Sequence, residues 1–158
     1  LAVELGNRHD GDVCFIATAE PFDDDMRERI DRHIADRPSW PTIEEPIELA
    51  VAVGSVPAGA LVIVDCITVW LGNLFHHLDD SARAARTEAL VDALSARTDP
   101  TVVISNEVGM GLVSEHALGR RFTDALGKLN TSIAAIADRS LLIVAGRALQ
   151  LQDPWELR

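Results

Sequence analysis

The sequence is short of positive charge. Lysine occurs once, at Lys128, and 14 lysines and arginines stand against 25 aspartates and glutamates, which gives a formal net charge of −11. This balance argues against an extended nucleic-acid partner, because phosphate backbones are bound by basic surfaces that release counterions. Anionic ligands must instead be held locally, by backbone amides, a few arginines or a metal ion.

Cysteines and long apolar runs are also scarce. Cys14 and Cys66 each lie in apolar, β-rich stretches without a metal-binding spacing, so we expect two reduced structural thiols. No apolar run is long enough to span a bilayer, and no charged-then-apolar signal segment follows Leu1. We therefore expect a cytoplasmic protein without a membrane span.

The 158 residues are 47% apolar and 25% charged, which is enough for one compact domain with a substantial core, spanning 1–158. Runs rich in β-branched residues alternate with amphipathic segments, so we predict an α/β fold with a mostly parallel sheet and helices on both faces. Prolines confine the extended piece at 40–46 to a sheet edge or a loop. The predicted strands lie at 13–18, 61–65, 101–105 and 140–145, and helices at 23–37, 47–53, 81–97, after Asp65 and after Ser114.

The run at 61–65 ends in a carboxylate. Its four apolar residues predict a strand buried on both faces, which places Asp65 at the carboxyl end, where open α/β sheets bind ligands. An acid there can hold a hydrated Mg²⁺ against the phosphates of a nucleotide. The same pattern also fits an aspartate that caps the following helix.

The predicted helix at 23–37 contains a second candidate. Met26, Ile30 and Ile34 form its apolar face, and His33 lies beside them. A histidine there can be a half-buried member of the face. It can also be a nucleophile, because a neutral imidazole can attack phosphorus while nearby arginines offset the phosphate charge. The arginines concerned are Arg29, Arg32 and Arg37.

Two glycines around a methionine follow the predicted strand at 101–105. The stretch at 106–111 therefore favours a ligand-binding loop at the same sheet edge as Asp65, although a plain connecting loop also fits.

Three local features complete the analysis. Residues 1–5 are typical of the end of a helix that is capped by Gly6. Ser114 is expected to cap the helix that follows it. The adjacent His76 and His77 cannot face one metal ion from a helix, so we expect them at the surface.

Together and in this order, several motifs resemble the bifunctional adenosylcobinamide kinase/adenosylcobinamide-phosphate guanylyltransferase family. They are the stretches at 23–30 with His33, 37–40, 64–68 with Asn73 and Leu74, 105–111, and 119–130. The resemblance covers nearly the entire chain. It implies a three-layer P-loop nucleotide-binding fold that acts late in cobalamin assembly, phosphorylating the aminopropanol hydroxyl of adenosylcobinamide with ATP or GTP and then transferring GMP from GTP onto that phosphate.

The resemblance also implies roles for individual residues. His33 looks like the histidine that attacks the α-phosphorus of GTP and holds GMP, and Asp65 matches the acid that binds Mg²⁺, directly or through water. The other implied GTP-binding residues are Ala17, Thr18, Ala19, Ile34, Ala35, Asp36, Arg37 and Glu44. The loop residues Asn106, Glu107, Gly109 and Gly111 would lie near the corrinoid or the phosphates. A homotrimer is implied as well.

One family feature is not found in this sequence. No stretch matches the Gly-x-x-x-x-Gly-Lys-Ser/Thr phosphate loop, and Lys128 is followed by leucine inside a predicted helix. Residues 1–5 resemble the end of the helix that follows that loop, so we expect the first strand and the loop to lie upstream. If they are truly absent, kinase activity is expected to be lost and GTP binding to be weak.

Two other functions remain open. The chain can be a noncatalytic nucleotide-binding or assembly module, which would accept no GMP adduct. It can also be a small-molecule kinase that uses Asp65 without a covalent histidine, in which case His33→Ala would be tolerated.

Overall fold

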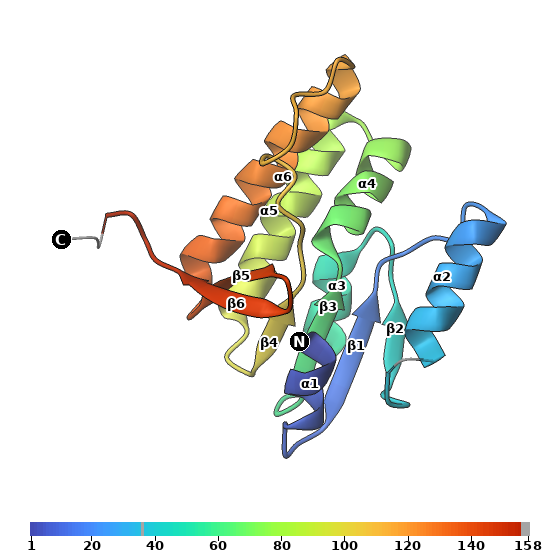
Figure 1. Ribbon diagram of the computed structural model, residues 1–158. Coiled ribbons are helices and arrows are strands. Elements are labelled where there is room, and N and C mark those ends of the chain that lie inside the picture. The colour runs from blue at the N-terminus through green and yellow to red at the C-terminus, as the bar shows by residue number, and fades with distance from the viewer. Residues whose placement is uncertain (36, 156–158) are drawn as a thin grey trace.

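The computed structural model describes residues 1–35 and 37–155 (Figure 1). In chain order its elements are α1 (Ala2–Asn7), β1 (Val13–Ala17), α2 (Asp24–Ala35), β2 (Thr42–Glu44), α3 (Leu49–Ser55), β3 (Leu61–Asp65), α4 (Ile67–His77), α5 (Asp80–Ala96), β4 (Thr101–Val103), α6 (Ala117–Ile136), β5 (Ser140–Val144) and β6 (Arg147–Leu151).

Four strands form a parallel sheet in the order β2-β1-β3-β4. The predicted α/β class with a mostly parallel sheet is thus confirmed. Pro41 and Pro46 flank the short strand β2, which lies at the edge of the sheet as the prolines predicted, because proline has no backbone N–H to donate to a neighbouring strand.

Helices and a tryptophan cover the two faces of the sheet. On one face, side chains of β1 and β3 pack against α3, α4, α5 and α6, and on the other face they pack against α1 and Trp40. Each fully buried Val, Leu or Ile side chain stabilises the fold by roughly 1.5–3 kcal/mol. The strand residues of the first face are Cys14, Ile16, Val62 and Val64, and those of the second are Val13, Phe15, Leu61 and Ile63.

Helix α4 follows directly from the central strand β3. Its apolar face is buried as the spacing predicted, through Ile67, Trp70, Leu71 and Leu74. The Trp70 indole N–H donates to the backbone carbonyl of Ile47 at 3.0 Å, which fixes α4 against the segment before α3. The last two residues of α4, the two adjacent histidines, are exposed as expected.

Two helix ends differ from the prediction. Helix α1 continues through Gly6 to Asn7. Gly6 is buried and packs so closely against Trp40 that an added Cβ would lie 2.4 Å from Cη2 of that indole. The glycine is therefore required by close packing and does not cap the helix. Helix α6 begins at Ala117 with His116 as its N-cap, and the hydroxyl of Ser114 accepts a hydrogen bond from the His116 N–H at 3.2 Å.

The last predicted strand does not join the parallel sheet. It forms β5, which pairs antiparallel with β6 in a separate hairpin. Both turn residues have positive φ, 49° at Ala145 and 70° at Gly146. Positive φ at both central positions gives the two-residue turn whose twist matches a β-hairpin, so local turn geometry returns the chain antiparallel.

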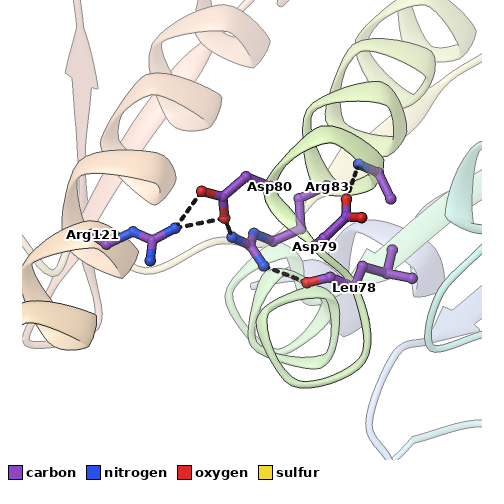
Figure 2. Close-up of polar contacts among 6 residues, drawn as sticks. Leu78, Asp79, Asp80, Arg83 and Arg121 are labelled. Carbon is purple, nitrogen blue, oxygen red and sulfur yellow. Dashed lines mark hydrogen bonds and ion pairs between the residues drawn. The ribbon is translucent and has the colours of Figure 1, made fainter.

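A charged junction connects helices α5 and α6 (Figure 2). The carboxylate of Asp80, in the first turn of α5, accepts hydrogen bonds from Nη2 of Arg121 on α6 at 2.5 and 2.6 Å. Asp80 also accepts from Arg83, which donates in addition to the carbonyl of Leu78. Asp80 is 74% exposed, so the ion pairs of this junction add little to the stability of the fold.

Aromatic contacts extend this junction to α4. The guanidinium of Arg83 lies 4.2 Å from the ring centre of Phe75, and that ring meets Phe122 of α6 edge-to-face at 5.5 Å. Helices α4, α5 and α6 are thus held together near one end. Among the residues described, no helix is both long enough and apolar enough to cross a bilayer.

Replacing Gly6 by alanine is expected to destabilise the protein by about 1–3 kcal/mol, because either α1 or the Trp40 indole must move to admit the methyl group. Denaturant unfolding measures the change. The matched control is Gly127→Ala in α6, where a Cβ meets nothing within 4 Å and the gain should be roughly 0.5–1 kcal/mol. Equal effects of the two substitutions would contradict this account of Gly6.

Burial raises the pKa of the Cys14 thiol above its ordinary value, and the Arg97 charge offsets part of the rise. Because the thiolate is the reactive form, Cys14 in a Cys66→Ala variant should react with an aromatic disulfide reagent only after unfolding. The raised pKa contributes stability that is fully present below the ordinary thiol pKa and is lost as the pH rises through the folded-state pKa. Fast labelling of the folded variant at neutral pH would disprove this prediction.

Candidate active site at the carboxyl edge of the sheet

Three of the predicted site residues end neighbouring strands at the same level. Ala17 on β1 is in register with Glu44 on β2 and with Asp65 on β3. Backbone hydrogen bonds continue the alignment past the strands, from Glu45 N–H to the Ala17 carbonyl at 2.9 Å and from Thr18 N–H to the Asp65 carbonyl at 3.1 Å. The loops after β1, β2 and β3 therefore begin side by side.

A buried hydroxyl and a buried amide hold these loops together. The Thr18 hydroxyl accepts a hydrogen bond from the Cys66 N–H at 2.9 Å and lies 2.9 Å from the Cys66 carbonyl. Nδ2 of Asn73 donates to the carbonyls of Thr18 at 2.7 Å and of Pro46 at 3.2 Å. One side chain from the loop after β1 and one from α4 thus satisfy backbone groups of all three loops.

His33 reaches the same edge from α2. Figure 1 shows α2 beside β2, at the opposite end of the molecule from α6. Nδ1 of His33 lies 3.9 Å from Oδ2 of Asp65, too far for a hydrogen bond, and the imidazole is 61% exposed. His33 is therefore more exposed than a half-buried core histidine would be, and an exposed imidazole is accessible to a ligand. The N-cap of α4 is Cys66, so Asp65 does not occupy the capping position.

Two of the arginines expected around His33, Arg32 and Arg37, have other contacts in the structure. The guanidinium of Arg37 lies 4.1 Å from the ring centre of Phe15, and its Nη1 donates to the Thr42 hydroxyl at 2.9 Å. Nε of Arg32 donates to the Glu28 carbonyl at 3.3 Å. The structure also brings the carboxylate of Asp65 to His33, a neighbour that the sequence did not predict.

The remaining nucleotide-binding candidates lie on the segments around this edge. Ala19 is half-buried in the loop after β1, whereas Ile34 and Ala35 are exposed in the last turn of α2. Asp36 and the side chain of Arg29 lie outside the described residues.

The glycine-containing loop after β4 is held at its start. The Asn106 N–H donates to the Thr68 hydroxyl on α4 at 2.9 Å. Asn130 on α6 accepts from the Ser105 hydroxyl at 2.6 Å and donates to the Asn106 carbonyl at 3.1 Å. The loop therefore starts next to the first turn of α4, which directly follows Asp65.

The tip of this loop is open to solvent. Glu107, Gly109, Met110 and Gly111 are all exposed, and Oε1 of Glu107 accepts from the Gly109 N–H at 2.9 Å. The loop thus combines an anchored base with an exposed tip, a form that suits contact with a ligand.

The donor atoms at the edge suit a magnesium ion that is shared with a nucleotide. Mg²⁺ is commonly bound by one or two carboxylates together with waters and substrate phosphates. Asp65 supplies one such carboxylate, and Glu44 lies at the same level of the sheet with β1 between the two residues. Within 1–35 and 37–155, no group of three or more His, Cys, Asp or Glu side chains is arranged to hold a metal by itself.

Sequence reasoning assigned no role to Thr68, Asn73 and Asn130, although all three lie in motifs that support the family resemblance. Asn73 gave a usable signal, because it is a polar residue between Leu71 and Leu74 on the apolar face of α4. Such a residue is stable there only if its amide is hydrogen-bonded.

Comparison with known proteins gives a consistent family. Residues 1–151 match the CobU family model, described as cobinamide kinase/cobinamide phosphate guanyltransferase. The chain is 39% identical over 142 residues to the bifunctional adenosylcobalamin biosynthesis protein CobP of Pseudomonas aeruginosa, with 89% of this chain and 82% of the relative covered. It is 30% identical to CobU of Escherichia coli and 32% identical to CobU of Salmonella typhimurium, over 89% of this chain and 86% of each relative.

Replacing Thr18 by valine should destabilise the protein by about 1–3 kcal/mol, because the Cys66 N–H loses its acceptor in a partly buried position. The matched variant Thr18→Ser keeps the hydroxyl and should cost clearly less. Denaturant unfolding of the two variants measures the difference. Equal stabilities would mean that the hydroxyl does not hold the two loops together.

Proposed function

The chain belongs to the cobinamide kinase/cobinamide phosphate guanyltransferase family, and we propose that it transfers GMP from GTP to adenosylcobinamide phosphate through a guanylylated His33. The observation that supports this mechanism best is the exposed imidazole of His33, 3.9 Å from Asp65 at the carboxyl edge of the sheet. Ligands of open α/β sheets bind at that edge.

In the first step, a neutral nitrogen of the His33 imidazole attacks the α-phosphorus of GTP. A nitrogen–phosphorus bond forms, the bond from that phosphorus to the bridging oxygen breaks, and pyrophosphate leaves with the electron pair. Splitting the transfer into two displacements is the usual advantage of a covalent intermediate. The exposure of His33 suits this step because the nucleophile must meet a phosphate that arrives from solvent.

In the second step, a phosphate oxygen of adenosylcobinamide phosphate attacks the same phosphorus. The new oxygen–phosphorus bond gives adenosylcobinamide-GDP, and the nitrogen–phosphorus bond breaks to return the imidazole. The kinase reaction comes before this step, because it transfers a phosphoryl group from ATP or GTP to the hydroxyl of adenosylcobinamide and so produces the acceptor.

Asp65 would hold Mg²⁺, directly or through water, and a bound Mg²⁺ would neutralise the charge of the phosphates. Residues at the ends of β1 and β2 and in the last turn of α2 would surround the nucleotide. We assign this role to Ala17, Thr18, Ala19, Ile34, Ala35, Asp36, Arg37 and Glu44. For Arg37, binding would require its guanidinium to leave Phe15 and Thr42.

The loop after β4 would contact the acceptor. Its members Asn106, Glu107, Gly109 and Gly111 follow the strand on the far side of β3 from β1 and β2. On family resemblance we also propose a homotrimer that works in the cytoplasm, and light scattering of the purified protein tests the first of these proposals.

Incubation with GTP and Mg²⁺ should add one GMP to the protein, and His33→Ala should abolish the gain completely because no other residue is proposed as the nucleophile. Intact-mass spectrometry without acid measures the adduct, since a phosphoramidate is labile in acid. The control is His76→Ala, which removes an exposed histidine on α4 and should label normally.

Labelling that persists in His33→Ala would refute the nucleophile. Guanylyl transfer without any adduct would favour direct displacement. A protein that binds nucleotide but transfers nothing would be the noncatalytic module. A protein that never guanylylates cobinamide phosphate, and whose His33→Ala variant still phosphorylates cobinamide normally, would be a plain kinase.

A further inference from the structure

We propose that Asn130 and Thr68 are positioning residues that hold the base of the loop after β4 in place for the corrinoid acceptor. This inference rests on the proposed function, because it assumes that this loop contacts the acceptor. Neither side chain is proposed to touch the reacting atoms.

Asn130 uses both ends of its amide on the start of the loop. Its Oδ1 accepts from the Ser105 hydroxyl at 2.6 Å, and its Nδ2 donates to the Asn106 carbonyl at 3.1 Å. Thr68 completes the arrangement by accepting from the Asn106 N–H at 2.9 Å. Both backbone polar groups of Asn106 are thus held by side chains, one from α6 and one from α4.

Helix α6 also holds the other end of this connection. Nη1 of Arg120 donates to the carbonyls of Ser114 at 2.9 Å and Glu115 at 2.8 Å. In Figure 1 the connection between β4 and α6 runs alongside α6 to the start of that helix. Between its two attachments the chain exposes apolar side chains, namely Met110, Leu112 and Val113.

The chemistry of this exposed stretch suits the corrinoid better than a triphosphate. Glu107 is its only charged residue between 105 and 113, and that carboxylate would repel phosphate oxygens. Apolar side chains and peptide groups can instead contact the large, mostly uncharged body of a cobinamide.

The strand order separates the two halves of the reaction. Most of the candidate nucleotide residues lie in or directly after β1, α2 and β2, on one side of β3, whereas the loop follows β4 on the other side (Figure 1). Asp65 lies between the two groups, at the end of β3. Loosening the base of the loop should therefore weaken acceptor binding and leave the reaction of His33 with GTP largely unchanged.

The position of α6 does not depend on Asn130. Leu126 and Leu129 of α6 are buried in the core with residues of α4 and α5. The contact between Phe75 and Phe122 and the bonds between Asp80 and Arg121 (Figure 2) add to this packing. Asn130→Ala should consequently free the loop base without displacing the helix.

The test separates the two half-reactions in Asn130→Ala and Thr68→Val. We expect the Michaelis constant for adenosylcobinamide phosphate to rise about tenfold in each, as the loss of one or two net hydrogen bonds implies. The rate of adduct formation from GTP alone should stay within about twofold, because the nucleotide half does not use the loop. Thr68→Ser should restore the acceptor affinity, and the control Thr131→Ala removes a hydroxyl on α6 that bonds only within its own helix, to the Gly127 carbonyl.

Equal losses in adduct formation and transfer, or an unchanged Michaelis constant, would overturn the proposal. Calorimetric titration with adenosylcobinamide phosphate tests it independently of the covalent mechanism, so weaker binding by the variants would support it even if His33 formed no adduct. If Asn130→Ala fails to fold, the comparison of Thr68→Val with Thr68→Ser decides the question alone.

Discussion

The parallel register of β1, β2 and β3 brings their carboxyl ends to one level, and the candidate active site depends on that alignment. Thr18 and Asn73, which are themselves buried, maintain it because they bond backbone groups of the three loops. A polar pair in this position is costly unless every hydrogen bond is made. Once made, the bonds fix Asp65 relative to the neighbouring loops with little freedom.

The helices that form the core and the helix that carries His33 contribute differently to the site. Helices α3 to α6 pack on one face and form the larger core, whereas none of the described side chains of α2 belongs to either hydrophobic cluster. The imidazole of His33 is 61% exposed and therefore accessible, as the proposed attack on GTP would require.

Local pattern predicted most elements of this fold. The β-branched runs became strands, the apolar spacing in 67–74 became the buried face of α4, and the prolines around β2 marked an edge strand. The misses at Gly6, Ser114 and β5 share one cause. At each position a residue type that commonly ends a helix or extends a sheet was used for something else: packing against Trp40, a turn before α6, and a hairpin.

The sequence by itself determined the class of fold, the family and the candidates His33 and Asp65, because these follow from periodicity, residue type and motif order. Only the tertiary structure decided that His33 lies beside a carboxylate while Arg37 lies over Phe15. It also decided that Asn130 holds a loop 24 positions earlier in the chain. Side chains that are distant in sequence meet only when strand order and helix packing are set. Neither strand order nor helix packing can be inferred from the residue pattern of one segment.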